Sequence, residues 1–214
     1  MMNEKIIEDG EKLFQSAENL RRSAPDLDAL MDSLWELIEE DDLFGQEEVW
    51  DLDDESALGK GKWFASAYAY NAGVMSRPKR ALKQVGTISI ITRLCNSDDM
   101  DDATPDWPWL NQACLILGWH PKNNPNDKWG IGNFDPDDDC VACIFHLGNG
   151  LWSWRTDDGD NAYFFVLPIF SLRNELDLKR FALRPLKILF DADDPSAVAE
   201  DAFHDVHVLM PQSG

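Results

Sequence analysis

The sequence predicts an α+β protein in which a helical N-terminal half precedes a mostly antiparallel β-sheet. Three observations predict this class: helical periodicity in the first forty residues, β-branched apolar runs after residue 85, and tight-turn residues between the later runs. Helices and strands do not alternate regularly, which disfavours a doubly wound sheet. We expect residues 1–55 to form a helical hairpin plus an acidic segment and residues 56–214 an α+β core; the alternative is a single domain over 1–214.

Two apolar faces predict the hairpin. The second is the clearer, because its apolar residues recur at helical spacing from Leu27 to Ile38. Ser23 resembles an N-cap and Pro25 lies in the first turn of the helix that would follow it. The alanine-rich stretch 61–75 is expected to add a buried helix. The residues of the first face are Ile6, Ile7, Leu13, Phe14, Ala17 and Leu20.

The strands are predicted from apolar, β-branched segments bounded by turn residues. Gly148-Asn149-Gly150 and the polar run 156–161 are tight turns, so the last strands form a meander between residues 139 and 170. A further strand at 182–190 contains Pro185, which indicates an edge or a bulge. A short helix begins near Asp194, and residues 206–210 are expected to return to the sheet. The expected strands are 85–95, 112–119, 139–147, 151–155 and 162–170.

The net charge of −21 is distributed in blocks along the chain. Residues 1–60 carry a net −14, residues 61–97 a net +6, residues 98–160 a net −10, residues 161–190 a net +3 and residues 191–214 a net −6. A field of this sign repels nucleic acids and anionic lipids and attracts basic proteins and cations. The composition therefore disfavours direct nucleic-acid and membrane binding.

The compartment is predicted from the chain start and the cysteines. The first residues are acidic, where a signal peptide has a basic start and an apolar run. The longest apolar run, YFFVLPIF at 163–170, is too short to span a bilayer. Cys95, Cys114, Cys140 and Cys143 lie in apolar stretches and are expected to be reduced thiols. These features predict a soluble cytoplasmic protein.

Residues 39–56 are the most unusual segment. Between Glu39 and Glu55 they place ten carboxylates in seventeen positions with no Lys or Arg, and apolar residues such as Trp50 alternate with the acids. A solvated loop is one interpretation. The other is an interaction surface, where carboxylates steer a basic partner and apolar side chains hold it. The sequence DWPWL after Asp101 and Asp102 repeats this combination.

The resulting hypothesis is a non-enzymatic, cofactor-free acidic protein that binds and inhibits a basic macromolecule. The partner would be a toxin, a nuclease or another nucleic-acid-binding protein. The chain would act as an immunity-type inhibitor or as a counter-defence protein that mimics the charge spacing of nucleic acid. The expected partner-binding residues are Glu39, Glu40, Asp41, Asp42, Glu47, Glu48, Trp50, Asp51, Asp53, Asp54, Asp101, Asp102, Trp107 and Trp109.

A metal-dependent hydrolase or nucleotide-processing enzyme is the alternative. It would use the carboxylates Asp135, Asp137 and Asp139, although this run departs from the EF-hand pattern. Cys140 and Cys143 begin a strand rather than a helix, so we expect core cysteines. No common catalytic motif occurs. Trp152 and Trp154 share one face of a strand, which fits core packing, a protein contact or a sugar-stacking platform.

Overall fold

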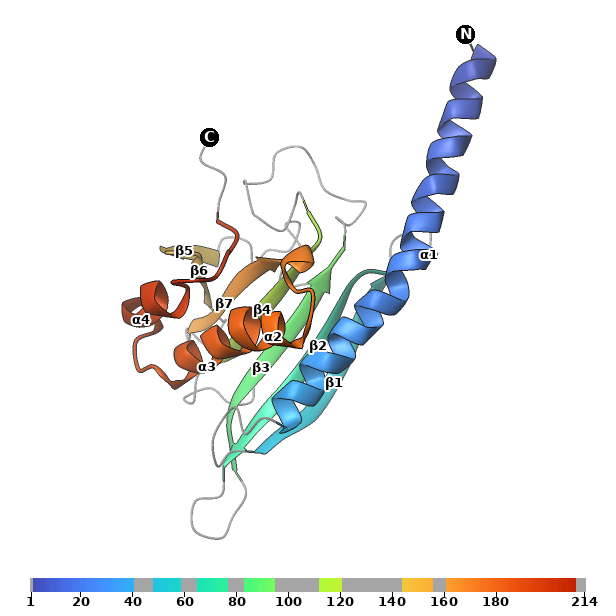
Figure 1. Ribbon diagram of the computed structural model, residues 1–214. Coiled ribbons are helices and arrows are strands. Elements are labelled where there is room, and N and C mark those ends of the chain that lie inside the picture. The colour runs from blue at the N-terminus through green and yellow to red at the C-terminus, as the bar shows by residue number, and fades with distance from the viewer. Residues whose placement is uncertain are drawn as a thin grey trace.

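The computed structural model describes residues 2–40, 48–58, 65–76, 83–94, 112–120, 144–155 and 161–210 and confirms the α+β class (Figure 1). A long N-terminal helix is followed by a sheet and then by short C-terminal helices. The elements are α1 (Met2–Glu40), β1 (Glu48–Leu58), β2 (Ala65–Ser76), β3 (Lys83–Arg93), β4 (Cys114–His120), β5 (Ile144–Gly148), β6 (Leu151–Arg155), β7 (Asn161–Pro168), η3 (Ile169–Ser171), α2 (Glu175–Asp177), η4 (Leu178–Leu183), α3 (Arg184–Asp191) and α4 (Pro195–Ala202).

The seven strands form one sheet in the order β1-β2-β3-β4-β7-β6-β5, and every neighbouring pair is antiparallel. The predicted meander is confirmed as β5, β6 and β7, which follow one another at one side of the sheet. The first turn of the meander has positive φ at Gly148, Asn149 and Gly150, a conformation that glycine and asparagine accept most readily. The expected strands near 85–95 and 112–119 correspond to β3 and β4.

Two apolar clusters lie on opposite faces of the sheet. The larger one joins alternate sheet residues such as Ile90 and Phe165 to Leu34 of α1 and Leu186 of α3, so α1 and the C-terminal helices cover the same face. The smaller one includes Ile91, Ile116 and Phe164 on the other face. Apolar burial on both faces explains why β3 and β4 read as continuous apolar runs.

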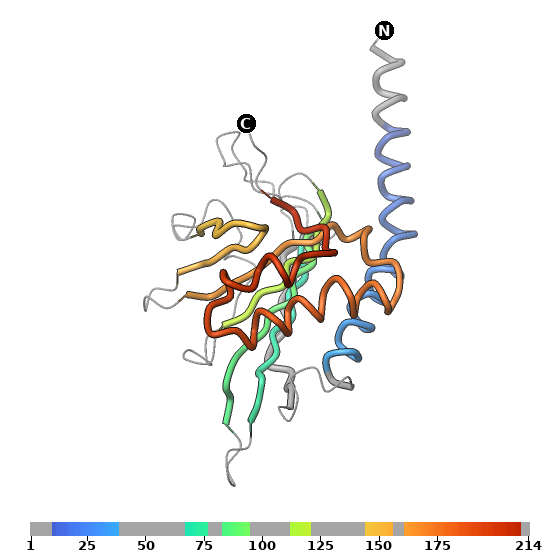
Figure 2. The backbone as a smooth tube through the Cα atoms, turned by 60° about the vertical axis from the view of Figure 1, so that its left-hand side comes forward, coloured from blue at the N-terminus to red at the C-terminus, as the bar shows by residue number. Residues whose placement is uncertain are grey.

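One continuous helix, α1, replaces the predicted hairpin. Ser23 is not an N-cap: its hydroxyl donates to the carbonyl of Asn19 at 2.9 Å, inside the helix. Pro25 lies within the helix on an exposed position, where the loss of one backbone hydrogen bond is tolerated. The second half of α1 lies along the sheet, and the first half projects away from it (Figures 1 and 2).

The stretch predicted as a buried helix at 61–75 is instead a central strand, β2, over residues 65–76. Ala69 belongs to one apolar cluster and Ala72 and Val74 to the other, so the segment alternates with a period of two. Its small residues fit between β1 and β3 with both faces covered. Tertiary packing therefore overrides the helical preference of alanine.

Residues 182–190, which the sequence predicts to be a strand, instead complete η4 and form α3. Pro185 lies in the first turn of α3, where the missing N–H is not needed. The predicted helix near Asp194 is α4, and the Asp194 side chain accepts a hydrogen bond from the N–H of Ser196. Residues 206–210 form no strand, although the N–H of Leu209 donates to the carbonyl of Val166 at 2.8 Å.

The acidic segment 39–56 is not a loop throughout, because its residues from Glu48 onwards belong to β1. Position 55, where the predicted helical and sheet-containing parts meet, lies inside this strand. Among the described helices, none is both long and apolar enough to span a membrane.

Candidate partner-binding surface

The acidic strand β1 stands at one end of the sheet. Within the described strands it pairs only with β2, so its other backbone edge faces away from the sheet. Five of the predicted partner-binding residues belong to this strand: Glu48, Trp50, Asp51, Asp53 and Asp54. The fold therefore brings one block of the predicted residues together on an edge strand.

The pairing of β1 with β2 is interrupted once in the acidic part. Asp51 is opposite Ala72, whereas Asp53 is opposite Asn71, so Leu52 is an extra residue in the ladder. Such a β-bulge increases the local twist of an edge strand and opposes its pairing with the flat edge of another sheet. Five acids and no base occur in the eleven residues of β1.

The neighbouring strand supplies no opposite charge. β2 has the sequence ASAYAYNAGVMS, without a single charged residue, and its register places Ala and Tyr opposite much of β1. Cross-strand pairs of opposite charge, which usually offset acids in a sheet, are therefore not available between these two strands. The negative charge of β1 remains unneutralised by its only described strand neighbour.

The other predicted binding residues lie outside β1, and most of them lie outside the described residues. Glu39 and Glu40 are the last two residues of α1. The remaining ones, and the alternative metal ligands, lie outside the described residues: Asp41, Asp42, Glu47, Asp101, Asp102, Trp107, Trp109, Asp135, Asp137 and Asp139. Over the described ranges, no group of three or more His, Cys, Asp or Glu side chains is placed to hold a metal ion.

The sheet face opposite the helices contains a buried polar row that the sequence did not reveal. The Ser89 hydroxyl donates to Asn71 Oδ1 at 2.5 Å, and both side chains are buried. Thr87 and His120 are buried cross-strand neighbours, and the His120 ring meets Trp154 edge-on with centroids 6.2 Å apart. Burial lowers the pKa of His120 from 6.5 to about 4, so the imidazole is neutral at pH 7.

His120 is expected to make the fold sensitive to mild acid. Its pKa is about 6.5 when unfolded and about 4 when folded, so between these values only the unfolded chain binds the proton. Protonation of His120 in the unfolded chain therefore lowers the free energy of unfolding as the pH falls from about 6.5 towards 4. Between pH 7 and pH 4.5 the loss is roughly 2–3 kcal/mol. His120→Gln should reduce the loss measured by urea unfolding, while exposed His207→Gln should leave it unchanged. An equal loss in wild type and His120→Gln would contradict this assignment.

The two tryptophans of β6 share a face, as predicted, and belong to the core side of the strand. Trp152 is buried and stacks on Phe164 with ring centroids 6.0 Å apart, and Trp154 packs against the same cluster. The ring centroids of His146 in β5 and Trp152 are 4.7 Å apart. Cys114 is a buried free thiol whose pKa burial raises to about 12, so it is not a reactive thiolate.

His204 and His207 follow helix α4 and lie on non-helical backbone. Helix α4 ends at Ala202, two residues before His204. The Nδ1 atom of His204 lies 3.0 Å from the Asp205 carboxylate, which also accepts a hydrogen bond from Arg180 at 3.1 Å. The Arg180 hydrogen bond, together with the charge of His204, lowers the pKa of Asp205. The segment thus ties η4 to the end of α4.

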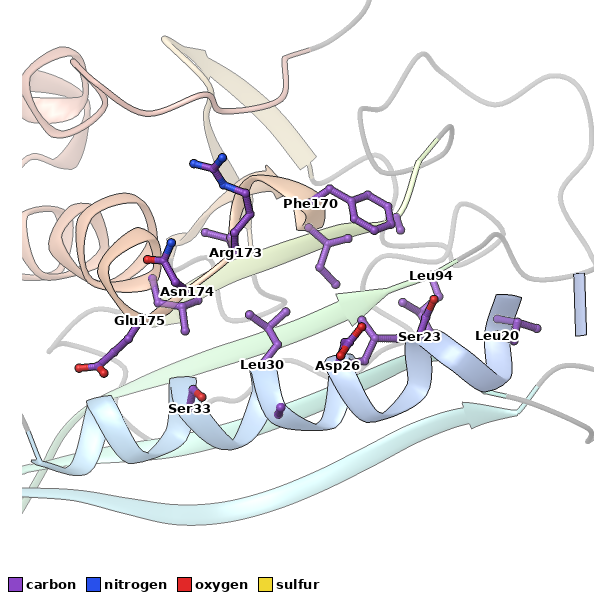
Figure 3. A pocket seen from close by; sticks show the side chains of 16 residues that line it. Leu20, Ser23, Asp26, Leu30, Ser33, Leu94, Phe170, Arg173, Asn174 and Glu175 are labelled. Atoms are coloured by element: carbon purple, nitrogen blue, oxygen red, sulfur yellow. The ribbon is translucent and has the colours of Figure 1, made fainter. Parts of the chain in front are cut away.

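A groove lies between α1 and the segment after β7, and no local sequence pattern predicts it. It has a volume of about 630 Å³ and is lined by Leu20, Leu27 and Leu30 of α1 and by Phe170 and Leu172 opposite them (Figure 3). Phe170 is 83% exposed, although it ends the apolar run that builds β7. Asp26, Arg173 and Glu175 contribute polar groups to the lining. The groove is therefore lined mainly by apolar side chains, together with side chains of both charges.

Comparison with protein-family models, with curated proteins and with solved structures found no match to this chain.

Proposed function

We propose that this protein binds a basic macromolecule through β1 and thereby inhibits it. The observation that carries the proposal is the concentration of five acids and Trp50 in an edge strand beside an uncharged strand. The partner class is a basic protein: a toxin, a nuclease or another nucleic-acid-binding protein. The chain would act in the cytoplasm, either as an immunity-type inhibitor or as a mimic of nucleic-acid charge.

The physical support comes from two properties of an edge strand. Its outer backbone edge has no strand partner among the described strands, and such an edge can pair with an extended segment of a partner, a mode of binding that gives affinity through main-chain hydrogen bonds. Carboxylates on this strand would raise the rate at which a basic partner arrives and set its orientation. The net charge of −21 on the whole chain strengthens the same long-range attraction.

Acids on an edge strand also have a purely protective role, because charge there prevents unwanted sheet-to-sheet pairing. The two roles predict different effects of neutralisation. If the acids only protect the edge, removing them causes self-association and leaves the binding of a basic partner unchanged. If they form the binding surface, removing them slows that binding.

Neutralising β1 should therefore weaken partner binding. In the variant Glu48→Gln/Asp51→Asn/Asp53→Asn/Asp54→Asn, we expect the association rate constant with the captured partner to fall at least about tenfold at low salt. The rate constant of the wild type should itself fall as salt is added, because screening weakens the attraction. Stopped-flow or surface-based kinetics at two salt concentrations provide the measurement.

The matched control changes the net charge by the same amount elsewhere. Asp28, Asp32, Glu200 and Asp201 are exposed and lie on α1 and α4, outside β1. Converting these four to Asn or Gln should preserve most of the association rate. Equal slowing by both variants would show that only total charge matters, and no slowing by the β1 variant would contradict the proposed surface.

A further inference from the structure

Helix α1 carries a heptad repeat that runs along its whole length and is not used by the proposed function. Successive apolar or small residues are separated alternately by four and three positions, the spacing of the a and d positions of a coiled coil. Up to Leu27, large residues at the d positions alternate with small residues at the a positions, and each set recurs every seven residues; the last two a positions are large. The d positions are Ile6, Leu13, Leu20, Leu27 and Leu34, and the a positions are Gly10, Ala17, Ala24, Met31 and Ile38.

The structure covers only the C-terminal half of this stripe. Leu34 and Ile38 are buried in the main core, against the sheet. Towards the N-terminus the stripe becomes exposed: Leu20 is 43% exposed and Leu13 73%. Phe14, which flanks the stripe at an e position, is 70% exposed. The exposed stripe therefore continues an interface that already exists within the molecule.

The projecting half of α1 contributes no residue to either apolar cluster of the described residues, and its Leu13 and Phe14 are mostly exposed. It extends well beyond the sheet (Figures 1 and 2). Gly10 within this half and Pro25 just beyond it both lower the intrinsic helical stability of α1. A segment of roughly twenty residues is only marginally helical in water, because most helical stability in proteins comes from packing of an apolar face. A surface that covers Leu13 and Leu20 would supply that packing.

We propose that this surface is the same stripe on a second copy of the chain, packed antiparallel and centred near Gln15. In this register Leu13 is level with Ala17 of the second copy, and Leu20 is level with Gly10. Every large residue of the exposed stripe thus meets a small one, which allows the helices to approach closely with filled layers. The pattern is self-complementary, as a two-fold interface requires.

A parallel pair fits this pattern poorly. It would set Gly10 against Gly10 and Ala17 against Ala17, which leaves alternate layers underfilled. It would also place both folded bodies at the same end of the helix pair, where the second half of α1 is already covered by its own sheet. In the antiparallel arrangement the two bodies lie at opposite ends.

The charges along α1 favour the same direction. Glu8, Asp9 and Glu11 give the first turns an excess of negative charge. Further along, Arg21 and Arg22 share the single carboxylate of Glu18, at 3.0 and 3.3 Å, so that this level carries an excess positive charge. Antiparallel pairing brings the acidic level of one copy to the basic level of the other. Parallel pairing would align like charges.

Self-association measures the proposal directly and does not require the basic partner, so its failure is distinguishable from failure of the proposed function. We expect sedimentation equilibrium at tens of micromolar to give twice the chain mass of 24.3 kDa. Leu13→Gln/Phe14→Gln should raise the dimer dissociation constant at least about tenfold. The control Leu147→Gln, on a leucine of β5 that is 41% exposed, should leave it unchanged. A monomeric wild type would overturn the proposal, as would a monomer that uses α1 to bind a different protein.

Two further variants test the geometry. Ala17→Leu should weaken the dimer, because a large residue would collide with Leu13 of the second copy; a stronger dimer would overturn the large-to-small packing.

Cross-linking tests the direction of the helices. Residue 16 lies close to residue 16 of the second copy at the two-fold axis, so a short thiol cross-linker should join two chains of the Ser16→Cys variant. It should not join two chains of the Ala24→Cys variant, because antiparallel copies of that position are separated by roughly 27 Å. Cross-linking of Ala24→Cys in preference to Ser16→Cys would indicate a parallel pair and overturn the assignment. The unsubstituted chain gives the cross-linking background.

Discussion

Leu34→Ala is expected to lower the free energy of unfolding by about 2–5 kcal/mol. Leu34 is fully buried and belongs to the same apolar cluster as Ile90 of β3 and Leu186 of α3. Truncating it removes buried methyl groups and leaves a cavity where α1 meets both the sheet and the C-terminal helices. Because α1 and the sheet share this core, we expect a single cooperative transition at lower denaturant concentration.

The control for this prediction is the same substitution at Leu176 of α2, which is 72% exposed. Leu176→Ala should change the free energy of unfolding by less than about 0.5 kcal/mol. Urea unfolding followed by tryptophan fluorescence and by far-ultraviolet circular dichroism measures both variants. If Leu34→Ala were as harmless as Leu176→Ala, α1 would not be packed on the sheet as described.

Gly150→Ala is expected to be the most damaging change in a turn. Gly150 has φ of +82°, which costs an L residue about 1–2 kcal/mol. A Cβ atom there would lie 2.9 Å from the Cβ of Val208 and would overlap one of its methyl groups. Overpacking of this kind adds about 1–3 kcal/mol. We expect a total loss of roughly 2–5 kcal/mol in the free energy of unfolding.

Two controls separate the strain from the overlap. Gly148→Ala in the same turn has φ of +104° but no described atom within 4 Å of the added Cβ, so it should show the backbone cost alone. In a Val208→Gly background, which removes the Cβ atom as well as both methyl groups, Gly150→Ala should also cost only about 1–2 kcal/mol. A Gly150→Ala loss that Val208→Gly leaves unchanged would show that residues 206–210 do not pack on this turn.

The sequence predicts the sheet best where the signals are local. The turn at Gly148 to Gly150 and the apolar segments of β6 and β7 need only neighbouring residues to be recognised, and the meander follows from them. Residues 65–76 could not be assigned in the same way. Their alanines favour a helix, and the strand forms because β1 and β3 cover both of its edges.

Two sequence predictions are wrong at positions close to a proline: the helix start at Ser23 and the strand around Pro185. Ser23 followed by Pro25 is a typical helix-start pattern. The helix nevertheless runs through both residues, because the apolar residues before and after them continue the same helical spacing. At Pro185 the apolar residues 182, 183, 186, 189 and 190 have helical spacing, but the β-like composition of the segment concealed it. Periodicity is the more reliable indicator in both cases.

The candidate surface was only partly predictable. The acids of residues 48–55 stand out in the sequence, whereas their position on an edge strand depends on the order of all seven strands. The buried row containing Asn71 and His120 results from cross-strand register. The groove beside Phe170 joins segments more than a hundred residues apart in sequence. Register and long-range contacts of this kind are not encoded in local patterns.

The most direct test of the proposed function is the capture of partners from nuclease-treated native lysate. The tagged baits are the wild type, the β1 variant and the charge-matched control, and each is used at low and at moderate salt. We expect the wild type and the control to retain the same basic protein in stoichiometric amount at low salt. The β1 variant should lose it, and moderate salt should reduce it for the wild type. Capture of that protein by the β1 variant as efficiently as by the wild type would contradict a binding role for the acidic edge strand.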